Sequence, residues 1–447
     1  MPATYESAVE RLLSLAPELW THKGQKPRRK FDLEHMRVLT EALGHPERRF
    51  PSVIVAGTNG KGSTSATLAS ILKASAYKTG LYTSPHLVRV NERIAIDGET
   101  ISDPEFAEVH SRIDDVSESL VRAGKLDEHP SFFETVTAMA FEYFASAGVE
   151  ITVLEVGIGG RLDATNVADP LLSVITDISL DHTEWLGNTL TEIAREKVGI
   201  VRRNGILVTL PQHPEVNDAL GERVRDLGAR VVNASQYVPP VTPAAGSFQT
   251  NENGLPHNRY PLEVMGEEIT VDSPLAGRHQ TRNVALAIAT AAELKHSFGY
   301  RITPAAIGKG VASTQWPGRF QVILGSPEIV LDVAHNPAGA WALRSALSSR
   351  YDSAPLTIIF GAMRDKDIAE IGEIIFPLAD EVIATRVSSP RAASPEEIRE
   401  LTSHIGVPIV GSHDLQDALR IARGRGRATV ITGSVYLVGA ALDLLRK

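Results

Sequence analysis

A glycine-rich run at residues 57–63, Gly-Thr-Asn-Gly-Lys-Gly-Ser, constrains the fold more than any other feature of the chain. It follows an apolar, strand-like segment at 53–56 and precedes a helical pattern at 65–73. A glycine-rich turn from a strand into a helix presents several backbone N–H groups and the positive end of the helix dipole. With one lysine and a hydroxyl added, the turn suits a nucleoside triphosphate and its magnesium ion. The sequence therefore predicts a P-loop-type site for ATP or GTP.

The run departs from the Walker A pattern, which begins with glycine and places Ser or Thr directly after lysine. Val55 stands at the position of the first glycine, and Gly62 separates Lys61 from Ser63. The inserted glycine displaces the hydroxyl that usually holds magnesium, so we expect other side chains to bind the metal. The alternative is an ordinary glycine-rich turn that binds no ligand.

Composition narrows the function classes. A chain of 447 residues with 43% hydrophobic residues predicts two or three packed domains. The net charge of −9, with both signs interspersed, argues against a nucleic-acid or anionic membrane surface. The absence of cysteine excludes disulfides and thiolate metal sites. Because neither a signal-peptide core nor a membrane-length apolar run is found, we expect a soluble, cytoplasmic protein. We expect a monomer because neither predicted domain shows an obvious extra apolar face.

Strand-like and helical segments alternate after the glycine-rich run. A Thr-x-x-Glu capping box at Thr189 and Glu192 opens one of the helices. This alternation predicts an α/β fold with a P-loop-type, doubly wound, mostly parallel sheet. The predicted strands are 79–82, 151–156, 172–176 and 205–210, and the predicted helices are 132–145, 189–198 and 277–294.

A second βα series without a glycine-rich run predicts a smaller, Rossmann-like C-terminal α/β domain. Trp316-Pro317-Gly318 interrupts regular structure before it, so we expect domains at 1–316 and 317–447. The predicted strands of the second domain are 329–333, 356–360, 381–385 and 429–432.

Three segments stand outside this alternation. Residues 5–19 predict an amphipathic helix, and a basic stretch follows at 23–30. That stretch is either a solvated loop or a loop that meets an anionic substrate. Residues 236–262 are rich in proline and predict an irregular insertion with a small antiparallel element.

Polar side chains follow the strands of the first sheet, where ligands of doubly wound folds bind. Hydroxyl, carboxylate and imidazole groups there, together with phosphate oxygens, predict a magnesium site. A purely structural role is the alternative for each: Ser84 caps a turn, Glu155 pairs with Arg161, or His182 is a loop histidine. The candidates are Ser84, Glu155, Asp177, Asp181 and His182.

Further candidates lie later in the chain. Lys197 falls late on a helix, where a solvated lysine is the simpler interpretation. In the second domain, Asn336 as N-cap and Pro337 at N1 are explained structurally, whereas Asp332 and His335 are not. Arg319 is a candidate for contacting a phosphate across a cleft. The glycines of 157–160 resemble a dinucleotide fingerprint only superficially, because Leu162 replaces the third glycine, so we do not predict NAD binding.

Together these motifs resemble folylpolyglutamate synthase and dihydrofolate synthase, a branch of the Mur ligase superfamily. The resemblance covers nearly the whole chain. Two positions depart from it: His45 replaces a frequent asparagine and Val333 a frequent glycine. The residues that carry it are 43–46, 57–63, 83–87, 91–94, 133–134, 155–166, 180–182, 195–197, Gly277, His279, Gln280, Asn283, 316–319, 331–332 and 334–336.

The resemblance implies an ATP-dependent ligase that adds L-glutamate to dihydropteroate, to a reduced folate, or to both. It places ATP on Gly57, Thr58, Asn59, Gly60, Lys61, Gly62, Ser63 and Thr64, with Asn283 near the adenine. Ser84, Glu155 and His182 match magnesium ligands, and Lys197 matches a lysine that is carbamylated in relatives and helps to hold a second magnesium. Arg319, Asp332 and His335 match second-domain residues that close on the nucleotide and the reaction centre.

The implied chemistry agrees with these parts. Transfer of the γ-phosphoryl group to a carboxylate forms an acyl phosphate, and Lys61, Arg319 and two cations offset the charge. The neutral amine of glutamate then attacks, and His335 is a candidate to orient or deprotonate it. Two alternatives stay open: a Mur-type cell-wall ligase, which the 56 residues before Gly57 disfavour, and a P-loop nucleotide switch that ligates nothing.

Overall fold

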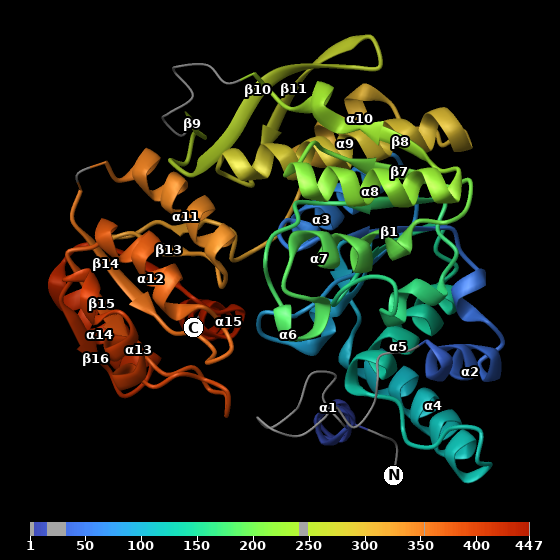
Figure 1. Cartoon of the computed structure of the whole chain (residues 1–447), viewed down its shortest axis with the longest axis horizontal. Coiled ribbons are helices and arrows are strands. Elements are labelled where there is room, and N and C mark those ends of the chain that lie inside the picture. The colour runs from blue at the N-terminus through green and yellow to red at the C-terminus, as the bar shows by residue number, and fades with distance from the viewer. Residues whose placement is uncertain (1–3, 16–32, 241–248, 353, 447) are drawn as a thin grey trace. The chain divides into compact units, whose positions relative to one another are not determined.

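A computed structural model describes residues 4–15, 33–240, 249–352 and 354–446, and the chain forms two compact units (Figure 1). The first comprises Met1–Ser84, Val90–Tyr237 and Ala285–Gly310, and the second comprises Pro85–Arg89, Val238–Val284 and Val311–Lys447. The predicted basic stretch at 23–30 lies outside the described residues, as do residues 16–19 of the first predicted helix. The predicted boundary between 316 and 317 stays a prediction.

The first unit contains an eight-stranded sheet with the strand order β4-β3-β2-β5-β1-β6-β7-β8. Strands β2, β5, β1, β6, β7 and β8 run parallel, and β3 and β4 add an antiparallel edge, which confirms the predicted mostly parallel sheet. The strands are β1 (Ser52–Ala56), β2 (Thr79–Tyr82), β3 (Ile94–Ile96), β4 (Glu99–Thr100), β5 (Ile151–Glu155), β6 (Leu172–Ile175), β7 (Ile206–Thr209) and β8 (Arg230–Asn233).

Helices cover both faces of this sheet. Ile54 and Leu154 belong to a core cluster with α1, α2, α4, α5, α7 and α8, whereas α3 packs against β1, β2 and β5 outside that cluster. Central strands buried on both faces need continuous apolar sequence, which explains 53–56 and 151–154. The helices are α1 (Tyr5–Ser14), α2 (Glu34–Ala42), α3 (Lys61–Ala74), α4 (Asp103–Arg122), α5 (Phe132–Ala147), α6 (Thr183–Leu186), α7 (Leu190–Lys197), α8 (Pro214–Leu227), α9 (Arg278–Phe298) and α10 (Pro304–Ala312).

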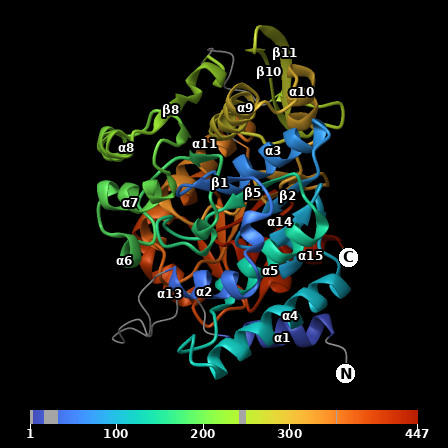
Figure 2. The same cartoon turned by 90° about the vertical axis from the view of Figure 1, so that its right-hand side faces the viewer.

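Local signals set the helix starts. The predicted capping box at Thr189 is confirmed, since its side chain accepts from Glu192 N and the Glu192 side chain from the backbone of Thr189. The 20-residue helix α4, which lies beside α1 (Figure 2), was not among the predicted helices. None of the helices in the described part of the chain is both long and apolar enough to cross a membrane.

The second unit contains a six-stranded sheet with the order β12-β13-β17-β14-β15-β16. Helices α11 and α12 pack against one face of it, and α14 and α15 against the other, which confirms a second α/β domain. The elements are β12 (Gln321–Ile323), β13 (Ile329–Leu331), α11 (Pro337–Arg350), β14 (Leu356–Phe360), α12 (Ile368–Ile375), β15 (Glu381–Ala384), α13 (Pro395–Leu401), β16 (Ile409–Gly411), α14 (Leu415–Arg425), β17 (Ala428–Thr432) and α15 (Val435–Arg446).

The predicted insertion is more regular than expected. Strands β9 (Gln249–Thr250), β10 (Pro256–Val264) and β11 (Glu267–Ser273) form a three-stranded antiparallel sheet, while 241–248 lie outside the described residues. The antiparallel element is thus confirmed, but the expectation of irregular chain up to residue 262 is wrong. Cross-strand pairing from Asn258–Ser273 to Val264–Glu267 outweighs the two prolines of β10.

Candidate active site

The strand order brings the predicted candidates of the first unit to one edge of the sheet. Strands β2, β5, β1 and β6 are consecutive neighbours, so their carboxyl ends lie side by side. Ser84, Glu155, Gly57 and Asp177 lie at or just after the ends of these strands, in that spatial order. The Ser84 backbone N–H donates to Glu155 Oε2 at 3.2 Å. The structure therefore brings Ser84 and Glu155 together beside the glycine-rich run.

The run adopts a conformation that only glycine permits. Gly57 has φ 153° and Gly60 has φ 89°. A Cβ atom on Gly57 would lie 1.8 Å from Thr176 Oγ1. The Thr58 and Asn59 N–H groups donate to the Asp177 carbonyl at 2.9 and 3.2 Å, which fastens the run to the loop after β6.

The run ends as the N-terminus of α3. Gly60 is the N-cap, and no side chain of the described residues caps it by a hydrogen bond. The first N–H groups of a helix and its positive dipole end attract anions. Lys61 adds an amine whose Nζ donates to the Gly57 and Thr58 carbonyls, each at 3.2 Å. The arrangement offers donors and positive charge to phosphate oxygens.

Lys197 is buried, so the simpler interpretation of its sequence position, a solvated lysine, is wrong. It is 4% exposed, and its Nζ donates to the Gly57 carbonyl at 2.8 Å. Burial, together with the charge of Lys61, lowers the pKa of Lys197 to about 7, against smaller opposing effects of Asp181 and Asp163. The last residue of α7 therefore places an amine that is partly neutral at physiological pH against the glycine-rich run.

His182 lies in the loop after β6, directly before α6. It adopts a left-handed conformation with φ 51°, and its N–H donates to Asp181 Oδ1 at 2.9 Å. Within the described ranges, no group of three or more His, Asp or Glu side chains has an arrangement suited to a metal ion. The ligand set that the resemblance implies, Ser84, Glu155 and His182, has one carboxylate and one imidazole, so a metal there would also need the Ser84 hydroxyl and ligands from outside the protein.

Asp163 organises the loop after β5 and was not among the predicted site residues. Its carboxylate accepts from Gly157 N, Ile158 N and Thr165 N at 2.9, 3.1 and 3.0 Å, and from Thr165 Oγ1 at 2.6 Å. Burial raises the pKa of this carboxyl group against those hydrogen bonds. The sequence signal for this role is an aspartate shortly after Gly159 and Gly160, in a loop whose backbone N–H groups need hydrogen-bond acceptors.

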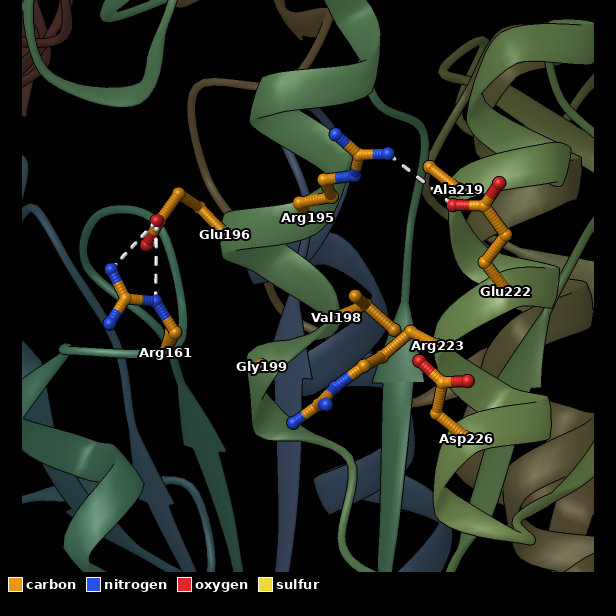
Figure 3. A pocket seen from close by; sticks show the side chains of 9 residues that line it. All are labelled: Arg161, Arg195, Glu196, Val198, Gly199, Ala219, Glu222, Arg223 and Asp226. Carbon is orange, nitrogen blue, oxygen red and sulfur yellow. Dashed lines mark hydrogen bonds and ion pairs between the residues drawn. The ribbon is translucent and has the colours of Figure 1, made fainter.

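Arg161 forms an ion pair with Glu196 at 2.9 Å (Figure 3). Both residues border a cavity of about 320 Å³ between α7 and α8, which was not predicted from the sequence. Its lining carries both charge signs, and Arg195 and Glu222 form a second ion pair across it at 3.4 Å. The cavity is lined by Arg161, Arg195, Glu196, Val198, Gly199, Ala219, Glu222, Arg223 and Asp226.

The remaining predicted residues belong to the second unit. Asp332 is buried and accepts from Phe320 N at 2.8 Å and Ala334 N at 2.9 Å, while burial raises its pKa. His335 Nδ1 lies 2.9 Å from the Val333 carbonyl, so this nitrogen carries the proton. The prediction that Asn336 is an N-cap is confirmed, since its side chain accepts from Gly339 N.

Two further candidates of the second unit make local contacts. The Arg319 guanidinium lies over the Trp316 ring, 5.8 Å from the centroid, and donates to the Gly318 carbonyl at 3.4 Å. Asn283 is buried on α9, and its amide donates to Gln280 Oε1 at 2.9 Å. Each of these contacts is made with a residue of the second unit.

Comparison with known proteins accounts for both units. Residues 55–291 match the Mur ligase middle domain, and residues 318–435 match the Mur ligase glutamate ligase domain. The fold and the two matches define the chain as a Mur ligase.

Individual relatives narrow the family. Folylpolyglutamate synthase of Lacticaseibacillus casei is 34% identical, over 92% of this chain and 94% of the relative. Dihydrofolate synthase/folylpolyglutamate synthase of Bacillus subtilis is 32% identical, over 94% and 96%. The structure of Mycobacterium tuberculosis folylpolyglutamate synthase complexed with ADP is similar with a TM-score of 0.87 and 32% identity, over 99% of both chains. The chain belongs to the folylpolyglutamate synthase and dihydrofolate synthase family.

Substitution of Gly57 by alanine tests the glycine-rich run. We expect Gly57→Ala to weaken ATP binding at least about tenfold, because the new Cβ meets Thr176 Oγ1 and the positive φ costs roughly 1–3 kcal/mol. Isothermal titration calorimetry measures the affinity. Gly221→Ala in α8, where a Cβ meets no atom within 4 Å, is the control and should bind like the wild type. Equal affinities for both variants would refute the steric argument.

The lowered pKa of Lys197 predicts a pH-dependent stability. Between pH 7 and the ordinary pKa of 10.5, the unfolded chain holds a proton that the folded chain lacks, so stability rises with pH. We expect the free energy of unfolding of the wild type to rise relative to that of Lys197→Met by up to about 1.4 kcal/mol per pH unit in this window. Urea unfolding of both proteins in bicarbonate-free buffers measures the difference. A difference that does not change with pH would contradict the burial of this amine.

Proposed function

We propose that this chain joins L-glutamate to dihydropteroate, to a reduced folyl(poly)glutamate, or to both, with ATP cleaved to ADP and phosphate. The observation that carries the proposal is the buried amine of Lys197, 2.8 Å from the Gly57 carbonyl, inside a Mur ligase fold. A nucleotide switch needs a phosphate cradle but has no use for a buried lysine held against it. The names of the relatives supply the substrate class.

The reaction must activate a carboxylate, because a carboxylate is a poor electrophile. Transfer of the γ-phosphoryl group of ATP to it forms an acyl phosphate, and the amine of glutamate then displaces phosphate. Gly57 to Thr64 form the proposed phosphate cradle, in which the first N–H groups of α3 and its positive dipole end face the phosphates. The Lys61 amine stabilises negative charge on the phosphates during transfer.

The donor set at the sheet edge fits magnesium. Glu155 is 4% exposed and its Oε2 accepts from the Ser84 backbone N–H, and carboxylate, hydroxyl and imidazole groups are donors that a hard divalent cation can use. Ser84, Glu155 and His182 would hold one Mg²⁺. A partly neutral Lys197 amine can react with carbon dioxide, and the resulting carbamate would supply an oxygen ligand for a second Mg²⁺. When bound, magnesium would neutralise negative charge on the phosphates.

The second unit contributes the remaining proposed residues. Asn283 contacts the adenine, and Arg319 offsets phosphate charge through its guanidinium. Asp332 holds the loop that leads to His335 by accepting from Phe320 N and Ala334 N. The Nδ1 proton of His335 faces the Val333 carbonyl, so Nε2 is the nitrogen that would orient or deprotonate the glutamate amine.

We further propose that the protein is cytoplasmic and that it is a monomer.

Phosphate release tests the proposed function. We expect release only when ATP, L-glutamate and one acceptor are all present, because the amine completes a reaction that the acceptor carboxylate begins. A coupled phosphate assay offers dihydropteroate and tetrahydrofolate separately, each with and without glutamate, and mass spectrometry identifies the product. Phosphate release that requires neither an acceptor nor glutamate would instead identify a nucleotide switch. A further arm offers a cell-wall precursor with an amino acid, and release in that arm alone would identify the other class of Mur ligase.

Substitution of Glu155 tests the metal assignment. We expect Glu155→Gln to raise the Mg²⁺ concentration for half-maximal activity at least about tenfold, because removal of one carboxylate ligand weakens a hard cation site. Glu150→Gln, just before the opposite end of β5, is the matched control and should keep the wild-type midpoint. A magnesium titration of phosphate release measures both. An unchanged midpoint in Glu155→Gln would remove this residue from the ligand set.

A further inference from the structure

Two segments of the first unit interlock through glycines beside Lys197. One is the loop at 157–168 after β5, and the other is the segment at 198–202 after α7. A Cβ on Gly160 would lie 2.8 Å from the Lys197 carbonyl oxygen, and a Cβ on Gly199 would lie 2.4 Å from Arg161 Cβ. The two backbones thus touch at positions that admit no side chain.

Hydrogen bonds cross the same contact. Arg161 N donates to the Glu196 carbonyl at 2.8 Å, and the Asn166 amide donates to the Gly199 carbonyl at 3.3 Å. Asn166 also donates to the Arg161 carbonyl at 3.0 Å, so its amide bridges the two segments.

Arg202 completes the contact with a planar fork of donors. Its Nη1 donates to Asn166 Oδ1 at 2.9 Å and to the Ile200 carbonyl at 3.1 Å. Its Nη2 donates to the Asn166 and Ala168 carbonyls at 2.9 and 2.6 Å. The ion pair with Asp169 at 3.3 Å adds little, since the Asp169 side chain is 88% exposed. Arg202 therefore acts through hydrogen bonds to the loop, which lysine could reproduce only in part.

The packing of α7 against α8 offers weaker support. There the end of the helix borders the cavity between α7 and α8, with Val198 and Gly199 in its wall (Figure 3). The ion pair of Arg195 with Glu222 is long, and both side chains are more than half exposed, so it holds the helix loosely.

We infer that Arg202 is a positioning residue of the ligase, which fixes the end of α7 so that the Lys197 amine stays against the Gly57 carbonyl. Lys197 is the last residue of α7, and a slip by one residue moves it about 1.5 Å along the axis. Such a slip exceeds the tolerance of a 2.8 Å hydrogen bond. The inference rests on the proposed function, in which Lys197 takes part in ligation.

Substitution of Arg202 separates positioning from folding. We expect Arg202→Met to keep a wild-type stoichiometry and affinity for ADP in calorimetry while kcat per nucleotide-binding site falls about tenfold or more, with KM for ATP within about threefold. The kcat of Arg202→Lys should lie between that of Arg202→Met and that of the wild type. Arg203→Met, an exposed neighbouring arginine, is the matched control and should keep the wild-type kcat.

Two outcomes would overturn the inference. The first is a melting temperature that falls in Arg202→Met while kcat per binding site stays within about threefold of the wild type. The second applies if Arg202→Met does not fold: an unchanged kcat in Arg202→Lys then rejects the positioning role. Lys197→Met distinguishes this failure from that of the proposed function: its near-complete loss of turnover supports the role of Lys197, and full turnover would reject both proposals.

Discussion

The hydrogen bond from Lys197 Nζ to the Gly57 carbonyl joins the two parts of the first unit on which the site depends. One part is the glycine-rich run, which carries the phosphate donors, and the other is α7, which begins at a capping box and ends at Lys197. A buried ammonium is costly, and the protein lowers this cost by letting the amine lose its proton near pH 7. The bond fixes the position of the amine, while burial and the charge of Lys61 lower its pKa.

In both units a buried aspartate accepts hydrogen bonds from backbone N–H groups that would otherwise lack an acceptor. Asp163 in the first unit accepts backbone N–H groups of the loop that follows β5, and Asp332 in the second accepts those of Phe320, before β12, and Ala334, after β13. Such loops cannot satisfy their own donors, and an aspartate with several acceptor sites satisfies them together. In both cases burial opposes ionisation while the hydrogen bonds favour it. Through these hydrogen bonds the two aspartates fix the backbone next to the candidate site residues.

Glycines in the first unit act at close approaches as much as in turns. Gly57 lies against Thr176, Gly160 against Lys197 and Gly199 against Arg161. Each contact joins segments that are distant in the sequence, so none could be inferred from local patterns. The extra glycine of the run, Gly62, was visible in the sequence. It is the reason to expect metal ligands at the ends of β2, β5 and β6, an assignment that stays a prediction.

Much of the fold was accessible from the sequence, because strand β1, helix α3 and the capped helix α7 are determined by apolar runs, glycine and capping residues close to one another in the chain. Helix α4 and the hairpin of β10 and β11 were not, since their stability comes from packing and cross-strand pairing. The sequence by itself determined the fold class, the family and the candidate residues. Only the tertiary structure decided that Lys197 is buried and that Arg161 pairs with Glu196. It also decided that Arg202 ties two loops together, because burial and long-range hydrogen bonds depend on which strands become neighbours.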